Sequence, residues 1–245
     1  MNLTHNNCIA EFKSGRFTGF CENSEQGQAL AAALLPDPGN LFASGETVCS
    51  PWHTASTDKV RIQLAGQEYF IKRYNCMGIR YRLKYLLRPS RALRSWRNGL
   101  CFLQRQVPTV GPVVCLEERF LGLLGNSYVV FPYLTDARSL LDCWHEFLPQ
   151  EQEEALLTLA EIIGHMHRQG IFHGDLNWRN LMVQKYDGQF RFYWIDLDGC
   201  HFQRKYNEIL AVRDLKHFYR DMERAAVPNR FVQEFRRAWQ AAVTD

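Results

Sequence analysis

Residues 173–199 constrain the fold of this chain more than any other segment. They read HGDLNWRNLMVQKYDGQFRFYWIDLDG, with two apolar runs flanking Asp187-Gly188. An Asp-Gly pair between such runs is typical of a tight β-hairpin turn. Asn180 and Asp196 lie equally far before and after residue 188, so we expect their side chains to face each other at the open end of the hairpin. Asp175 precedes the hairpin, on the loop that leads into it.

This arrangement predicts that three oxygen-bearing side chains converge, namely Asp175, Asn180 and Asp196. Carboxylate and amide oxygens are ligands for a hard cation such as Mg²⁺, which also binds substrate phosphates. A loop carboxylate such as Asp175 suits a base that accepts a hydroxyl proton as the oxygen attacks phosphorus. Alternatively, each residue only caps a turn, as Asp and Asn often do. The occurrence of all three at these spacings favours the catalytic interpretation.

Strand-like patterns dominate the first part of the chain and helical patterns the second. Residues 1–40 are mixed, and residues 58–74 form a predicted hairpin that carries Lys72 near its end. Residues 88–106 have a helical apolar stripe with Ser90 as the expected N-cap, and residues 148–170 predict a second helix. We therefore expect an α+β protein with a strand-rich first domain, residues 1–132, and a helix-rich second domain, residues 133–245.

Composition excludes several classes of protein. Apolar residues make up 46% and charged residues 22%, which is typical of a globular protein and not of a disordered one. The eight cysteines form no CxxC pair, so a zinc framework is not indicated and buried thiols in a reducing cytoplasm are expected. The first residues do not resemble a signal peptide, and the apolar stretches are too short to span a bilayer.

Basic residues are concentrated between Lys72 and Arg105. This segment contains ten Lys and Arg residues and no Asp or Glu, and because the net charge is +3, the remainder carries 3 − 10 = −7. Such a cluster creates a local positive potential. Two interpretations remain open, a solvated helix face or a surface for an anionic partner such as phosphate-rich lipid, a membrane or nucleic acid.

HGDLNWRN followed by YWIDLDG resembles the catalytic loop and metal-binding segment of the protein-kinase-like superfamily, whose pattern is H-x-D-x-x-x-x-N and then the Asp of a D-F-G equivalent. The DLN and IDLD variants in so short a chain resemble the bacterial lipopolysaccharide core kinases, which phosphorylate Kdo or heptose sugars of the inner core. FIKRYN, residues 88–113 and SYVVFPYL are similar to the first lobe of that family.

The resemblance implies a protein-kinase-like two-lobe fold, with a β-rich N-lobe and a compact α-rich C-lobe, and ATP and Mg²⁺ as cofactors. It implies that Asp175 is the catalytic base and that Asn180 and Asp196 bind Mg²⁺. Lys72 would hold the α- and β-phosphates of ATP, and Asn177 would contact the γ-phosphate. His173 is expected to brace the loop.

The sequence departs from the kinase pattern before and after Lys72. No G-x-G-x-x-G precedes it, and residues 43–56 are a poor substitute. No acidic residue follows it until Glu117 and Glu118, so one of these pairs with the lysine or phosphate alone orients it. Only 245 − 196 = 49 residues follow Asp196 and A-P-E is absent, which favours a small-molecule or glycolipid acceptor over a protein.

We therefore expect an ATP- and Mg²⁺-dependent kinase that phosphorylates a heptose or Kdo hydroxyl of the lipopolysaccharide core. It would be cytoplasmic and peripheral at the inner membrane, with its basic segment 72–105 on the anionic membrane surface. The alternatives are a soluble small-molecule phosphotransferase of the aminoglycoside or choline type and a pseudokinase that binds without catalysis. A nucleic-acid partner is not expected, because no recognised binding motif accompanies the arginines. The sugar, the hydroxyl and the oligomeric state stay open.

Overall fold

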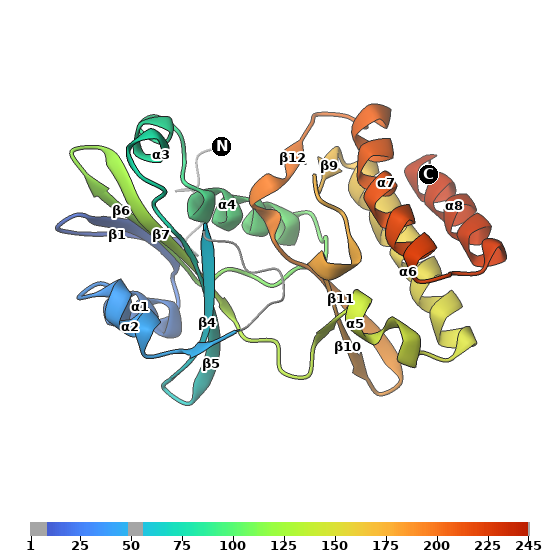
Figure 1. Cartoon of the computed structure of the whole chain (residues 1–245), viewed down its shortest axis with the longest axis horizontal. Coiled ribbons are helices and arrows are strands. Elements are labelled where there is room, and N and C mark those ends of the chain that lie inside the picture. Colours follow the sequence, from blue (N-terminus) through green and yellow to red (C-terminus); the bar gives the residue numbers. More distant parts are fainter. Residues whose placement is uncertain (1–8, 49–55, 245) are drawn as a thin grey trace. The chain divides into compact units, whose positions relative to one another are not determined.

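The structure is a computed structural model that describes residues 9–48 and 56–244 (Figure 1). The chain divides into two compact units. The first contains Met1–Cys101 and Val110–Leu134, and the second contains Phe102–Thr109 and Thr135–Asp245. Part of the segment 43–56, the poor substitute for a glycine-rich loop before Lys72, lies outside the described residues.

The first unit is built on a seven-stranded antiparallel sheet with the strand order β1-β2-β6-β7-β5-β4-β3. Its strands are β1 (Ile9–Ser14), β2 (Phe17–Glu22), β3 (Glu46–Thr47), β4 (Thr57–Leu64), β5 (Gln67–Tyr74), β6 (Val114–Phe120) and β7 (Leu123–Pro132). Its helices are α1 (Glu25–Leu34), α2 (Pro38–Ala43), α3 (Ile79–Lys84) and α4 (Arg91–Gln104), of which α4 continues into the second unit.

Helices pack on both faces of this sheet, because successive strand residues point to opposite sides. Leu30 and Leu34 of α1 join Ile71 of β5 in one apolar cluster. Trp96 of α4 joins Tyr74 of β5 in another cluster, on the opposite face. The predicted N-cap of α4 is confirmed, since Oγ of Ser90 accepts a hydrogen bond of 3.0 Å from the backbone N–H of Leu93.

The second unit contains long helices, short helical turns and two small sheets. Its elements are β8 (Arg138–Ser139), α5 (Leu140–Cys143), η2 (Trp144–Glu146), α6 (Pro149–Arg168), β9 (Ile171–Phe172), η3 (Trp178–Asn180), β10 (Leu181–Tyr186), β11 (Gln189–Trp194), η4 (Leu197–Gly199), β12 (His201–Phe202), α7 (Glu208–Arg224) and α8 (Asn229–Thr244). Helices α6, α7 and α8 enclose a core that includes Trp178, Phe218 and Phe235. The helix predicted over residues 148–170 is confirmed as α6, and Gly170 follows it with a φ of 72°.

Four cysteines are buried as the sequence predicts, namely Cys21, Cys101, Cys115 and Cys143. Cys76 and Cys200 are partly exposed, while Cys8 and Cys49 lie outside the described residues. Within residues 9–48 and 56–244, no helix has both the length and the apolar character that a membrane crossing requires.

Candidate functional site

The hairpin of β10 and β11 positions the residues that the sequence analysis singled out. Leu181 pairs with Trp194, and Asp187 and Gly188 form the turn with φ values of 49° and 77°. Two consecutive left-handed residues are typical of the two-residue turns that join antiparallel strands. The predicted hairpin and its turn are therefore confirmed.

The strand register differs by one residue from our expectation. The turn is centred between residues 187 and 188 and not on residue 188, so Asn180 lies opposite Ile195, whose N–H donates a 3.0 Å hydrogen bond to the Asn180 carbonyl. The prediction that Asn180 and Asp196 pair directly across the hairpin is wrong. Asp196 is the next residue, exposed and in the left-handed region at φ 64° and ψ 48°, where η4 begins.

The loop before the hairpin holds the carboxylate of Asp175 with two amides. Nδ2 of Asn177 donates to Oδ1 of Asp175 over 2.8 Å, and Nδ2 of Asn180 donates to Oδ2 over 3.1 Å and to the Asp175 carbonyl over 3.0 Å. Nδ1 of His217, on α7, lies 3.5 Å from Oδ1. The side chain of Asp175 nevertheless remains 57% exposed, so a substrate hydroxyl can reach it. The structure thus brings together Asp175, Asn177 and Asn180.

Both the oxygen and the nitrogen of the Asn177 side-chain amide form hydrogen bonds within the loop. Its Oδ1 accepts hydrogen bonds of 3.1 Å from the N–H groups of Arg179 and Asn180, which caps η3. Its Nδ2 donates to Asp175, and the residue is only 2% exposed. The structure therefore shows a positioning role for Asn177, while its contact with a γ-phosphate stays a prediction.

A buried carboxylate on α7 fixes the backbone of the same loop. Asp214 accepts from the N–H of His173 over 2.6 Å and from the N–H of Gly174 over 2.8 Å. Gly174 has a φ of 83°, and a Cβ there would lie 2.7 Å from the carbonyl oxygen of Gly199. The buried ring of His173 donates from Nε2 to the Ile195 carbonyl over 3.0 Å, so His173 braces the loop as expected.

A second carboxylate on α7 also accepts a hydrogen bond from the backbone of this loop. Oδ2 of Asp221 accepts a 3.0 Å hydrogen bond from the N–H of Trp178, and Asp221 is 5% exposed. Sequence reasoning missed both Asp214 and Asp221. Their signal is that they lie seven residues apart on the buried stripe of an amphipathic helix, where an acidic side chain requires hydrogen-bond donors.

Helix α8 contacts this network through a buried histidine of α6. Nε1 of Trp239 donates to Nδ1 of His167 over 3.1 Å, and Nε2 of His167 lies 3.4 Å from Oδ2 of Asp214. Because Nδ1 accepts, the ring proton is on Nε2 and points towards the carboxylate. Three helices thus support one loop.

Lys72 lies in the first unit, on the face of the sheet that α4 covers. It is 6% exposed, paired in register with Val129 of β7, and its Nζ lies 5.0 Å from the ring centroid of Tyr74. The guanidinium of Arg91 lies 4.6 Å from the same ring. Lys72 is therefore buried beside an aromatic ring, whereas an ordinary lysine on a strand is exposed to solvent.

The two acidic candidates for pairing with Lys72 have other partners. Glu117 accepts from the N–H of Ser90 over 2.9 Å and from Nε of Arg119 over 2.9 Å, so it supports the start of α4. Glu118 forms an ion pair of 3.1 Å with Arg16.

The available oxygen ligands fit Mg²⁺ better than a transition metal. In the part of the chain that the structure describes, no group of three or more His, Cys, Asp and Glu side chains could hold a metal ion. Mg²⁺ needs fewer protein ligands, because it is usually held by one or two carboxylates together with phosphates and water. Nδ2 of Asn180 faces Asp175, and its Oδ1 accepts no hydrogen bond from a described residue, which leaves that oxygen as a candidate ligand.

Comparison with known proteins agrees with this geometry. Residues 39–239 match the lipopolysaccharide kinase (Kdo/WaaP) family. The chain is similar to a solved structure of WaaP in complex with acyl carrier protein, with a TM-score of 0.63, 19% identity, and coverage of 84% of this chain and 83% of that one. It is also similar to the Rio2 kinase-ADP/Mg²⁺-phosphoaspartate complex from Chaetomium thermophilum, with a TM-score of 0.55, 15% identity, and coverage of 98% and 73%. No curated protein matches the chain. The expected protein-kinase-like fold is thus confirmed.

Proposed function

Because the chain belongs to the lipopolysaccharide kinase (Kdo/WaaP) family, we propose that it transfers the γ-phosphate of ATP to a heptose or Kdo hydroxyl of the lipopolysaccharide inner core. The observation that carries this proposal is the carboxylate of Asp175. Both of its oxygens accept hydrogen bonds from side-chain amides, yet more than half of the side chain is open to an incoming hydroxyl.

Asp175 is the proposed catalytic base. As the sugar oxygen attacks phosphorus, the bond from phosphorus to the β-γ bridging oxygen breaks, ADP leaves and the hydroxyl proton passes to the carboxylate. Proton transfer by a positioned side chain contributes about 10²- to 10⁴-fold to the rate. The two amides supply the positioning, because they restrict the rotation of the carboxylate before substrate arrives.

Asn180 and Asp196 are the proposed ligands of Mg²⁺. When bound, the ion would neutralise charge on the ATP phosphates. The candidate ligand atom of Asn180 is Oδ1, because its Nδ2 is occupied by Asp175. Lys72 is the proposed contact of the α- and β-phosphates, and the similarity to a kinase solved with ADP and Mg²⁺ supports these cofactors.

The acceptor is proposed to be a core glycolipid at the cytoplasmic face of the inner membrane. Lipid A and the inner core carry phosphates and carboxylates, which match the positive charge of the segment from Lys72 to Arg105. The similarity to WaaP and the family match support a lipopolysaccharide substrate.

Incubation with Mg·ATP and a series of truncated core glycolipids, followed by mass spectrometry, tests this proposal. We expect one added phosphate on glycolipids that retain the acceptor sugar, and a loss of about 10²-fold or more for Asp175→Ala. Choline and an aminoglycoside serve as control acceptors. Phosphorylation of a control acceptor alone, or Mg·ATP binding without transfer to any glycolipid, would contradict the proposal in favour of a soluble phosphotransferase or a pseudokinase, respectively.

A further inference from the structure

An apolar patch is exposed around α3 and the neighbouring β6–β7 turn of the first unit. Among the described residues, seven of the thirteen large hydrophobic side chains that are exposed come from residues 77–87 and 120–121. The most exposed are Leu87 at 94% and Leu121 at 85%. We define the α3 patch by six of these residues, Met77, Ile79, Leu83, Leu87, Phe120 and Leu121.

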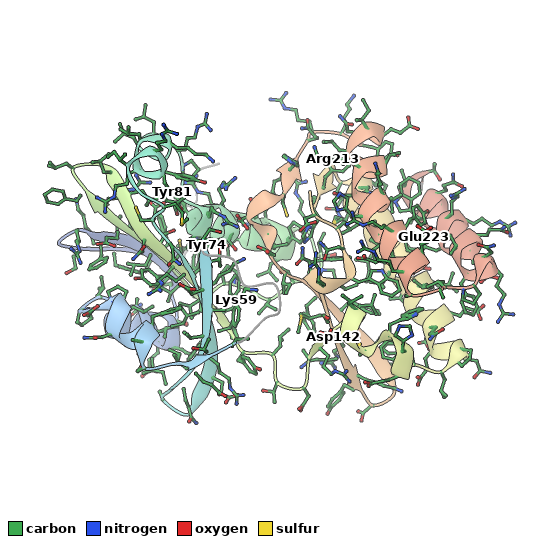
Figure 2. All side chains as sticks on the ribbon, in the orientation of Figure 1. Lys59, Tyr74, Tyr81, Asp142, Arg213 and Glu223 are labelled. Atoms are coloured by element: carbon green, nitrogen blue, oxygen red, sulfur yellow. The ribbon has the colours of Figure 1, made fainter. Side chains whose placement is uncertain are left out.

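Hydrogen bonds from one arginine join the two segments of the α3 patch. Nη1 of Arg119 donates to the carbonyls of Tyr85 and Gly122, each over 3.0 Å, and its Nη2 donates to the carbonyl of Arg88 over 3.3 Å. Glu117 holds the same guanidinium over 2.9 Å. Figure 1 shows α3 beside the ends of β6 and β7, and Figure 2 marks Tyr81 on this helix. The two segments that carry the apolar side chains are therefore held together.

Four exposed cations accompany the α3 patch, namely Arg80, Arg82, Lys84 and Arg88. On α3, Arg80 and Lys84 lie four residues apart, as do Ile79 and Leu83, so a basic stripe runs beside an apolar one. No Asp or Glu occurs in the sequence between residues 72 and 117, and Nε of Arg82 also donates to Sγ of Cys76 over 3.2 Å.

Most of the other basic residues of the segment are buried or have partners within the protein, whereas Arg97 of α4 is exposed. Lys72 is buried, and Arg73 pairs with Asp58 over 2.7 Å. Arg91 donates to Thr57 over 3.3 Å, and Arg105 donates to the carbonyl of Gln169 over 2.8 Å. Four of the five exposed cations of the segment therefore lie on α3 or shortly after it, and the fifth is Arg97 on α4.

We propose that the α3 patch is the membrane-binding surface of this protein. Its leucines and Phe120 would enter the acyl region of an anionic bilayer, while the four cations bind lipid phosphates. Short helices with an apolar stripe beside basic residues bind membrane interfaces through both effects. Exposed apolar side chains such as Leu87 and Leu121 mark a membrane or protein interaction site, and the four cations beside them match an anionic bilayer. The choice of lipid as partner rests on the proposed function, whose acceptor is a glycolipid.

Sedimentation of the full chain with vesicles of equal parts phosphatidylethanolamine and phosphatidylglycerol tests the apolar contribution. We expect the partition coefficient of Leu83→Ser/Leu87→Ser to fall about tenfold or more. The matched control is Leu148→Ser/Ile209→Ser, which removes two apolar side chains of similar exposure from the second unit. This control should bind like the unmodified protein. All four positions are exposed, and equal thermal midpoints would show that folding is intact.

The charge contribution is tested with Arg80→Gln/Lys84→Gln against Arg204→Gln/Arg237→Gln, which removes the same charge from exposed positions of the second unit. Only Arg80→Gln/Lys84→Gln should lower vesicle binding and make that binding less dependent on salt concentration. The proposal is overturned if the unmodified protein ignores the vesicles, if the leucine pair has no effect, or if either control loses as much. Patch-dependent binding to acyl carrier protein without vesicle binding would show an acidic protein partner instead. The vesicles contain neither core sugar nor nucleotide, so the result is separate from the test of phosphate transfer.

Discussion

Asn177 donates a 2.8 Å hydrogen bond from its side-chain amide to Oδ1 of Asp175. The oxygen of the same amide caps the helical turn that follows. A single buried side chain therefore fixes both the backbone of the loop and the orientation of the proposed base. These two roles can be separated by substitution, because they use different atoms.

Asn177→Ala should lower both stability and phosphate transfer. Loss of a capping oxygen costs about 1 kcal/mol in the free energy of unfolding, which urea denaturation measures. Asn177→Asp keeps a capping oxygen but places a second carboxylate beside Asp175, so it should lose activity with a smaller loss of stability. Equal activity in Asn177→Asp and the unmodified protein would show that the amide does not position the base.

Asp214→Ala should destabilise the protein by on the order of 3 kcal/mol, because it leaves the N–H groups of His173 and Gly174 without an acceptor. Asp214→Asn retains one oxygen and should lose less. The matched control is Asp142→Ala, an exposed carboxylate that accepts a hydrogen bond from Ser139. Urea denaturation gives the three differences, and a control as destabilised as Asp214→Ala would refute the anchoring role.

Lys72→Met should lower phosphate transfer about a hundredfold and raise the KM for ATP, because it removes the positive charge proposed to contact the nucleotide phosphates. The apolar stem is preserved, and the thermal midpoint of the variant shows whether folding is intact. Lys13→Met, at an exposed position of β1, is the control for general effects of losing a lysine. Unchanged kinetics in Lys72→Met would remove Lys72 from the proposed site.

Stability should fall at alkaline pH because of buried thiols. Burial raises the pKa of the Cys143 thiol from its ordinary value of 9.0 to about 11, and it also raises the pKa of Cys115. Between these two values for Cys143, the folded state keeps a proton that the unfolded state releases, so the free energy of unfolding decreases as pH rises. The contribution is fully present below pH 9.0 and is lost as pH rises through about 11.

Urea denaturation of Cys143→Ala below and within this pH window measures that contribution. The decrease in the free energy of unfolding should be smaller in Cys143→Ala than in the unmodified protein. Comparing each variant with itself at two pH values removes the separate effect of lost side-chain volume. Identical decreases in Cys143→Ala and the unmodified protein would contradict this account.

Local patterns were sufficient to predict several elements and most of the loop. Apolar patterns predict the α4 and α6 helices and the hairpin of β4 and β5, and the Asp187-Gly188 pair predicts the hairpin of β10 and β11. The registers of these elements depend on finer detail. The two-residue turn Asp187-Gly188 is centred between these residues, which places Asn180 opposite Ile195, whereas our expectation centred the hairpin on residue 188.

Contacts between distant segments were not predictable in the same way. Asp214 lies 41 positions from His173 along the chain, and nothing near HGDLNWRN indicates which residue accepts its backbone N–H groups. For the surface around α3, the sequence predicted the positive charge but not the apolar side chains. Exposure of Leu83 and Leu87 depends on how the helix packs. The strands β1 and β2 and the helices α1 and α2 were not predicted, because the mixed sequence of residues 9–43 shows no clear apolar period.

The buried chain from Trp239 through His167 to Asp214 has a consequence for the last helix. Helix α8 is the third support of a loop that lies some sixty residues earlier in the sequence. A frameshift or protease cut that removes α8 would leave every proposed catalytic and metal-binding residue intact. We expect the shortened protein to lose activity, because His167 would lose its hydrogen bond from Trp239. His167 faces Asp214, which is the carboxylate that holds the backbone of the loop.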